Sequence, residues 1–322
     1  MLHNVMINNF FFPVSVGGIM NNNVTILVNS CDLYEDTWYT FFKLLQIQWP
    51  KCPYKKVLHT ETKEYTCPFF EVKTVKTGKD LSWTARLKKA LEQIDTEYVL
   101  FFLEDFFLLS EVRVEAFNKA LDIIDNNPDI GLIHFTPTEK NMPTPNDDLD
   151  NCFYELPIRK RTLRTRVAVS LFRKDYLLKL LYKDENPWQY ERESHIRSMF
   201  AGYKIIRQDY SLYPPTFHYC LDHDIGIGVT SRKWLKNNKS FFESMGIYDV
   251  NYDNLGVFSN ESYQKMKDDK ANIKIVGFKE WFYVKFKQPI KRKLRHSWLI
   301  QDILNFKKYI KYWMYYKFEY KN

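Results

Sequence analysis

Apolar runs of strand length alternate with helical patterns through the first part of the chain. The runs have the length and residue content of buried strands, and they are Val24–Asn29, Lys56–His59, Glu97–Leu103 and Ile130–Phe135. Helical patterns lie between them, at about Glu35–Gln48, Trp83–Ile94 and Val112–Asn126. Alternation of this kind builds a mostly parallel sheet with helices on both faces, because each connection must cross over the sheet. We therefore expect an α/β fold.

A proline-rich stretch separates this alternation from a more mixed second half. Thr136–Asp150 contains three prolines with several Asn and Asp residues, which predicts a loop. Beyond it the patterns predict a strand at Arg166–Phe172, a helix at Lys174–Tyr182 and a helix from Pro187 to about Phe200, opened by a capping box of Asn186 and Gln189. The chain thus divides into an N-terminal extension (1–22), a first half (23–135), a second half (136–262) and a C-terminal tail (263–322).

The positive charge of the chain is concentrated near its C-terminus. Between Lys274 and Asn322 there are 11 Lys and 2 Arg against 3 acidic residues, a net charge of +10, which leaves −2 of the total +8 for everything before. A nucleic-acid-binding core would have its basic stripe within the folded domain, so this distribution argues against a nucleic-acid partner.

The cysteines and the N-terminal apolar run indicate in which cellular compartment the protein is expected. Five cysteines are scattered without a CxxC pair, which argues against a disulfide framework and favours a reducing cytoplasm. The run Phe10–Val14 is too short to span a bilayer and is followed by Gly17 and Gly18, so we expect neither a membrane span nor a signal peptide there.

Two adjacent acids, Glu104 and Asp105, follow the apolar run that ends at Leu103. Ligands of open α/β sheets bind beyond the carboxyl ends of strands, so these acids are the first candidates for a site. Carboxylates in this position can hold Mg²⁺ or Mn²⁺, which disperses the charge of a diphosphate leaving group by bridging its oxygens. The alternative is an ordinary solvated strand end, where acids cap a following helix.

Two segments around these acids resemble a known family. Leu81–Leu87 (LSWTARL) and Tyr98–Leu108 (YVLFFLEDFFL) are similar to bacterial surface-polysaccharide glycosyltransferases of GT-A type, in which a tryptophan-containing helix start precedes a strand with a DxD-like metal motif. The chain departs from strict DxD, because Leu103 stands at the first Asp position and only Asp105 matches the last. More weakly, the resemblance extends over about residues 24–260 and includes Ser231–Trp234 (SRKW), which is similar to a basic segment after the acceptor region.

The resemblance implies a GT-A-type, Rossmann-like mixed sheet flanked by helices, with the C-terminal tail as a helical basic extension. It implies a hexosyltransferase-type enzyme that moves a sugar from a nucleotide-diphosphate donor, such as a UDP-sugar, to a hydroxyl of a polysaccharide or lipid-linked oligosaccharide, with inversion. The first half would bind the nucleotide-sugar and the second half the acceptor. Glu104 and Asp105 would hold Mn²⁺ or Mg²⁺, and Asp32, Trp83 and Arg86 would contact the donor. From the residues alone, the latter three are equally a turn-stabilising Asp, a core Trp and a surface Arg.

An inverting transferase also needs a base near the acceptor hydroxyl. Glu191 is our candidate, with Trp188 and His195 on the same helical face, because this arrangement resembles the Trp-then-acid pattern of the family. A solvated helix face is the alternative, and Glu193 is the rival acid. A second metal site remains open in the His- and Asp-rich run that contains His218, Asp222, His223 and Asp224.

The C-terminal tail combines a basic run, Lys291–Arg295, with a helical pattern whose apolar stripe includes Leu299, Ile303, Phe306, Ile310 and Trp313. Such a helix can lie on an anionic lipid surface, which would place the protein peripherally on the inner face of the cell membrane. The alternative is a helix that packs its stripe on the domain. Two other functions stay open: a non-catalytic basic protein that binds membrane or nucleic acid, and a sugar nucleotidyltransferase, although no Gly-rich phosphate loop follows Val28.

Overall fold

The computed structural model describes residues 23–136, 148–157, 164–182, 184–220, 227–230, 232–259 and 308–319. The predicted N-terminal extension, most of the predicted loop at Thr136–Asp150 and the basic run before the tail helix lie outside these residues.

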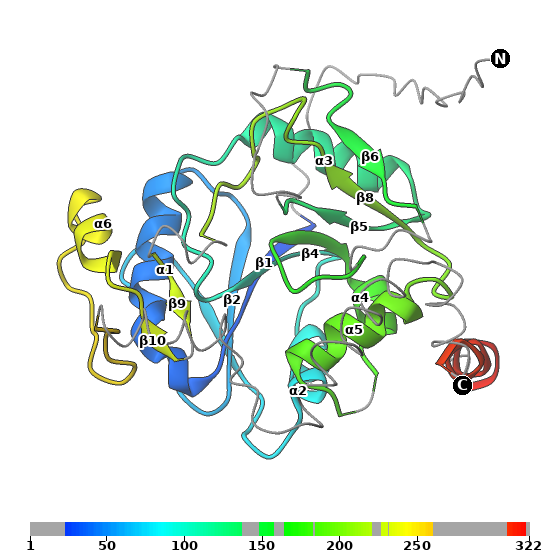
Figure 1. The fold of residues 1–322 in the computed structure, drawn as a ribbon, viewed down its shortest axis with the longest axis horizontal. Helices are drawn as coiled ribbons and strands as arrows, with labels where there is room; N and C mark the ends of the chain where they lie inside the picture. The colour runs from blue at the N-terminus through cyan, green and yellow to red at the C-terminus, as the bar shows by residue number, and fades with distance from the viewer. Residues whose placement is uncertain are drawn as a thin grey trace, which may run out of the picture.

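An eight-stranded mixed sheet forms the centre of the molecule (Figure 1). Its strands, in chain order, are β1 (Val24–Asn29), β2 (Lys55–Thr60), β3 (Lys73–Lys76), β4 (Tyr98–Leu103), β5 (Ile130–His134), β6 (Phe153–Glu155), β7 (Ser170–Arg173) and β8 (Lys204–Gln208). Their order across the sheet is β3-β2-β1-β4-β7-β5-β8-β6. Strands β3, β2, β1 and β4 pair in parallel, β7 is antiparallel to both neighbours, β5 and β8 are parallel, and β6 is antiparallel to β8. The predicted α/β fold with a mixed sheet is confirmed.

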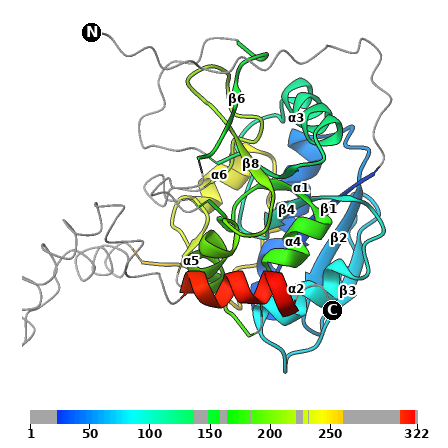
Figure 2. The same cartoon turned by 90° about the vertical axis from the view of Figure 1, so that its right-hand side faces the viewer.

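Helices cover both faces of the sheet (Figures 1 and 2). They are α1 (Glu35–Gln48), α2 (Trp83–Leu91), α3 (Val114–Asn126), α4 (Lys174–Leu180), α5 (Pro187–Arg197) and α6 (Asn238–Ser244), with a short 3-10 helix η1 (Asp32–Tyr34) before α1. Apolar residues of α1, α3 and α6 pack with one face of the sheet, and those of α2, α4 and α5 pack with the other. A small hairpin of β9 (Val229–Thr230) and β10 (Lys233–Trp234) lies outside the main sheet.

Local sequence accounts for several of these elements. All six residues of β1 are buried, as expected for a central parallel strand covered on both faces. The Ser82 side chain caps α2 by accepting from the Ala85 N–H, and the predicted capping box of Asn186 and Gln189 opens α5. On β5, a Cβ on Gly131 would come within 2.4 Å of the Tyr176 ring, so α4 can approach the strand closely because that residue is glycine.

The two predicted halves share one sheet. Strand β7 comes from the second half but lies between β4 and β5 of the first. The strand predicted at Arg166–Phe172 begins only at Ser170, because the residues before it form a turn that leads toward α5. Strands β3, β6 and β8, the hairpin and α6 were not predicted from the sequence.

The described part of the tail is a helix that packs on the domain. Residues 308–314 are helical and continue into a π-helical turn at Tyr315–Glu319. Figure 2 shows this helix beside α5, and the buried Tyr312 donates to Glu193 of α5. In contrast, Ile310, Trp313 and Met314 are 44%, 47% and 45% exposed. Tyr312 therefore packs on the domain, as the alternative prediction for the tail helix has it, while Ile310, Trp313 and Met314 form an apolar strip that stays exposed. Among the described helices, none has the length and apolar content needed to cross a membrane.

Candidate active site

The carboxyl ends of β1 and β4 form a topological switch point. The chain continues from β1 to β2 and β3 on one side of the sheet, whereas β4 pairs with β1 on the other. At such a point the connections diverge and leave a crevice beyond the strand ends, which is where open α/β sheets bind ligands. The register pairs Asn29 with Leu103, so the residues after β1 lie beside Glu104 and Asp105.

Glu104 and Asp105 are two acids in a site with little water. Burial raises the pKa of Glu104 well above its usual range, and the adjacent Asp105 charge raises it further. Burial raises the pKa of Asp105 to about 6. The Asp105 Oδ1 atom is buried and has no hydrogen-bond partner. The local fold therefore holds two carboxyl groups in surroundings that disfavour their ionised form, which is common at functional sites.

Residues from three segments surround these acids. Burial, Glu104 and Asp105 together raise the pKa of Tyr34 to about 12, and Arg232 opposes them. Arg232 therefore brings positive charge from the predicted SRKW segment toward the acids. Among the described residues it is the single non-glycine with positive φ, at 62°, and Trp234 beside it stacks on Phe107 with 5.7 Å between the ring centroids. Backbone strain of this kind is often found at binding sites.

Asp32 lies at the same edge, but its carboxylate is occupied. It accepts backbone hydrogen bonds from Glu61, Thr62 and Lys63 at 3.1, 2.9 and 3.1 Å, and its other oxygen accepts from the Thr62 hydroxyl. Burial would raise its pKa, but these hydrogen bonds and Lys79 lower it below the usual range. In this structure Asp32 fixes the turn after β2, as in the turn-stabilising alternative. Its contact with a nucleotide stays a prediction.

Arg86 and Trp83 both lie on α2 but face different surroundings. Arg86 forms an ion pair with Glu61, at the end of β2, and both side chains are largely buried. Burial, Glu104 and Glu61 together raise the pKa of Cys31 to about 11 while Arg86 lowers it, so Cys31 lies near both the acid pair and the Arg86 ion pair. The structure thus brings Asp32, Arg86 and the two acids to one edge of the sheet.

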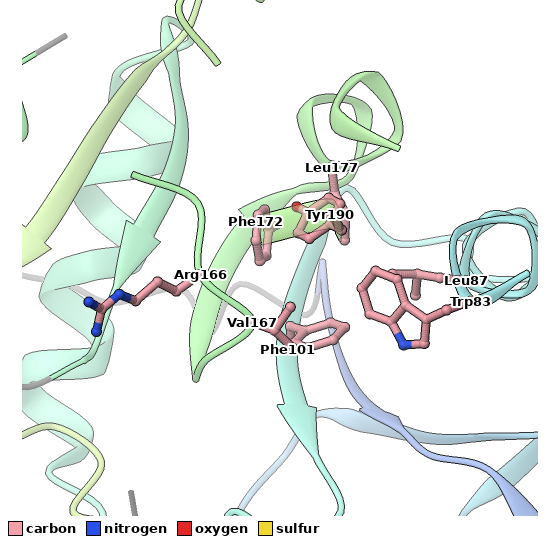
Figure 3. Close-up of a pocket in the computed structure, with 8 residues that line it drawn as sticks. All are labelled: Trp83, Leu87, Phe101, Arg166, Val167, Phe172, Leu177 and Tyr190. Atoms are coloured by element: carbon pink, nitrogen blue, oxygen red, sulfur yellow. The ribbon is translucent and has the colours of Figure 1, made fainter. Parts of the chain in front are cut away.

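Trp83 faces an apolar cavity instead. The cavity lies between α2, β4 and the segment before β7 (Figure 3). It is lined by Trp83, Leu87, Phe101, Arg166, Val167, Phe172, Leu177 and Tyr190. Figure 3 shows the Arg166 guanidinium directed away from the aromatic side chains. Its lining is mostly apolar, so we regard it as packing space beside the site, and the donor contact of Trp83 stays a prediction.

The predicted base, Glu191, has a structural partner, and its neighbours do not form one functional face. Its Oε1 accepts from the Val167 N–H at 2.9 Å. Trp188 is 70% exposed, whereas His195 accepts from the Arg164 N–H. Burial and the Arg164 charge lower the pKa of His195 to about 4, so this imidazole is neutral at pH 7. The role of Glu191 as base stays a prediction.

The rival acid, Glu193, has a clear structural role. It pairs with Lys308 and accepts from Tyr312, both of the tail helix. This leaves Glu191 as the better base candidate. In the His- and Asp-rich run considered as a second metal site, His218 is exposed and its Nδ1 lies 3.4 Å from Ser110 Oγ. The other candidates, Asp222, His223 and Asp224, lie outside the described residues.

A divalent cation is compatible with the acid pair. Within the residues that the structure describes, no group of three or more His, Cys, Asp or Glu side chains is arranged to hold a metal. Mg²⁺, however, is usually bound through one or two carboxylates, with water and substrate phosphates completing its shell. The unpartnered Asp105 Oδ1 and the buried Glu104 supply that number.

Three contributors were missed from the sequence. Glu61 follows β2 in the same way that Glu104 follows β4, so strand-end position could have identified it. Tyr34 and Cys31 lie in the turn after β1, which the sequence showed only as polar. They became evident only from the pairing of β1 with β4.

No protein-family model matches the chain, and no curated protein matches it either. Among solved structures it is similar to TarS of S. aureus, with 12% identity over 84% of this chain and 47% of that chain and a TM-score of 0.44. It is similar to TarS 1–349 in complex with UDP, with 13% identity over 91% of each chain and a TM-score of 0.43. It is also similar to the mannosyltransferase PcManGT of Pyrobaculum calidifontis in complex with GDP-Man and Mn²⁺, with 14% identity over 60% of this chain and 55% of that chain and a TM-score of 0.41. The chain thus spans about half of the longer TarS chain and most of the shorter one.

Proposed function

We propose that the protein is a glycosyltransferase that uses a nucleotide-diphosphate sugar. The observation that supports this most is the pair of uncompensated acids, Glu104 and Asp105, at the switch point between β1 and β4. Such a pair has a reason to exist if a cation and a diphosphate complete it. A nucleotidyltransferase would be expected to bind phosphates with a Gly-rich loop after the first strand, and Asn29–Asp32 contains no glycine.

In this proposal each part of the site has a role. Glu104 and Asp105 would hold Mg²⁺ or Mn²⁺, which when bound would supply positive charge to the diphosphate. Arg86, fixed by Glu61, adds positive charge beside the diphosphate, and its planar fork suits phosphate oxygens. Glu191 takes the proton of the acceptor hydroxyl as that oxygen attacks the anomeric carbon on the face opposite the departing diphosphate, and attack on that face gives inversion. The acceptor is a hydroxyl of a polysaccharide or of a lipid-linked oligosaccharide.

Donor binding tests the proposal directly. We expect one of the UDP-, GDP-, CMP- or dTDP-sugars to raise the melting temperature in the presence of Mn²⁺, because a ligand that binds only the folded state stabilises it by about 2.7 kcal/mol at 100 times its Kd. Thermal-shift measurements with and without Mn²⁺ would identify the donor. UDP and GDP-Man are suitable first probes. Absence of a shift with every donor would refute the proposal.

The tail helix is the proposed membrane contact, which would keep the enzyme at the inner face of the cell membrane. Its outer strip of Ile310, Trp313 and Met314 is exposed next to lysines. Burying an apolar side chain contributes about 1.5–3 kcal/mol, so the double substitution Ile310→Ser and Trp313→Ser should weaken binding to anionic vesicles about tenfold or more. Sedimentation with phosphatidylglycerol vesicles measures this.

A matched control is available on the domain itself. Tyr248 is 74% exposed, so Tyr248→Ser removes a comparable exposed aromatic ring far from the tail in sequence. Vesicle binding should be unchanged in this variant. Equal binding of wild-type protein to neutral and anionic vesicles, or unchanged binding of the tail variant, would contradict a membrane role.

A further inference from the structure

Three arginines of the second half lie together near the carboxyl end of β5. We call Arg164, Arg166 and Arg207 the arginine cluster. Burial and the charges of Arg207, Arg166 and Arg164 together lower the pKa of His134, on β5, to about 3. His134 is therefore neutral; its ring lies 2.7 Å from the Arg164 carbonyl oxygen and it pairs with Arg207 across the strands, so the three arginines lie around it.

The cluster has little compensation. Arg164 and Arg207 are 1% and 3% exposed, and the Nε atoms of all three arginines are buried without a hydrogen-bond partner. Arg164 donates to Ser198 Oγ at 3.1 Å, and Tyr154 and Tyr210 are the neighbours that raise the pKa of Arg207. Glu155 acts on the pKa of Arg164, but its side chain is exposed. In the described part of the chain, none of the three guanidinium groups forms a salt bridge.

Other buried arginines of the same fold do have carboxylate partners. Arg173 pairs with Glu97, and the Nη1 and Nη2 atoms of Arg197 each donate to one carboxylate oxygen of Glu185. A buried cation without a counterion is costly, because desolvation is not repaid by attraction. Among the described residues, Arg173 and Arg197 have carboxylate partners and the three arginines of the cluster have none, which suggests that a ligand supplies the missing negative charge.

The strand register places the cluster on the same edge as the acid pair. His134 pairs with Arg207 on β8 and with Ser170 on β7, so these residues lie at the carboxyl ends of β5 and β8. Strand β4, which leads into Glu104, runs parallel to β5, so its carboxyl end is at that edge too. At about 4.8 Å per strand, Arg207 on β8 lies about 14 Å from β4. The cluster therefore lies at the same edge as the acid pair but three strands away from β4, on the side of β5 and β8.

Glu191 links the cluster to the proposed acceptor side. Its carboxylate holds the Val167 N–H, immediately after Arg166, and the Arg166 guanidinium extends away from the apolar cavity (Figure 3). The segment of Arg166 therefore contacts Glu191 through its backbone, and a group bound by the Arg166 guanidinium would lie outside the cavity.

We propose that Arg166 and Arg207, supported by Arg164, form a binding site for a phosphate group. Three guanidinium groups can supply paired N–H donors to its oxygens, and the ligand neutralises the buried charge. Resting on the proposed function, this phosphate belongs to the acceptor, so that the sugar is added to a phosphate-containing acceptor.

Phosphate binding by the full-length protein tests the site. Titration with inorganic phosphate, at an ionic strength held constant with chloride, should give a saturable rise in melting temperature. Arg207→Gln and, separately, Arg166→Gln should weaken this binding at least tenfold. Without phosphate, each variant should melt at the same temperature as wild type or higher, because a repulsive buried charge is removed. Arg192→Gln is the matched control, since this arginine is exposed on α5, and it should bind phosphate normally.

The source of the phosphate is distinguished by a second arm with UDP and Mn²⁺. If the cluster binds the acceptor, both variants should keep UDP affinity within about twofold of wild type. Equal loss of UDP and phosphate binding would assign the cluster to the donor and overturn the proposal, as would a wild-type response no larger with phosphate than with chloride. A variant that is less stable without showing altered phosphate binding would mark the arginines as structural. Phosphate binding without any nucleotide binding would keep the site and refute the transferase function instead.

Discussion

Replacement of Asp105 by asparagine should lower donor-dependent turnover by about 10²–10³-fold while the protein stays folded. Loss of one preorganised electrostatic group at a reacting centre typically costs this much. Asp105 is the better target of the two acids, because its Oδ1 is buried without a partner inside the protein. Asn keeps the size of the side chain but removes the charge. Release of nucleotide from the identified donor measures the effect.

The same substitution has a stability signature with a defined sign. The folded protein holds the proton of Asp105 more tightly than the unfolded chain, since burial raises its pKa from 3.8 to about 6. Stability from this group is therefore fully present below about pH 4 and is lost as the pH rises through 6. The Asn variant lacks this loss, so its melting temperature should equal that of wild type near pH 4 and exceed it at pH 8.

The control is Asp95→Asn, an exposed acid before β4. It should change neither turnover nor the pH dependence of melting. Glu191→Gln identifies the step, because the amide oxygen can still accept from Val167 while it cannot act as a base. It should bind the donor normally and lose transfer. Asp105→Asn with full turnover would exclude Asp105 from the mechanism.

The parts of the fold that were predictable are those whose signal is local. Strands β1 and β4 are buried on both faces and are therefore apolar along their length, and the capping box of α5 lies within four residues. Strands such as β3, with the sequence KTVK, and β8, which contains Arg207, are polar in part. Their pairing is decided by distant neighbours, so no local pattern marks them.

The site was predictable to the same extent. The position of Glu104 and Asp105 follows from the end of one apolar run, and the sheet then brings Asp32 and Arg86 to the same edge. Whether a side chain is free is a different question. Asp32 is occupied by a turn about thirty residues later, and Glu193 by a tyrosine 119 residues away. Such long-range partners cannot be inferred from spacing, which is also why the unpaired arginines emerged only from the structure.

Arg197→Ala should destabilise the protein by about 3–5 kcal/mol, because it leaves Glu185 buried and unpaired. The guanidinium donates to both Glu185 oxygens, at 2.7 and 2.6 Å, and to the Leu180 carbonyl at 2.9 Å. At roughly 2–4 °C per kcal/mol for a chain of this size, the melting temperature should fall by about 10 °C. Thermal unfolding followed by circular dichroism measures it.

Two comparisons show whether burial causes this effect. Lys204 and Asp129 form an ion pair at 2.8 Å, but their side chains are 42% and 51% exposed, so Lys204→Ala should cost less than about 1 kcal/mol. Replacing Arg197 by Met together with Glu185 by Leu removes both charges and should recover most of the loss, because no buried charge remains. If Arg197→Ala and Lys204→Ala lowered the melting temperature equally, the Glu185 pair would not depend on its buried setting. The tail helix adds a second readout: Tyr312 contacts Arg197 at 3.3 Å, so faster proteolysis of residues 308–319 should accompany the loss of stability.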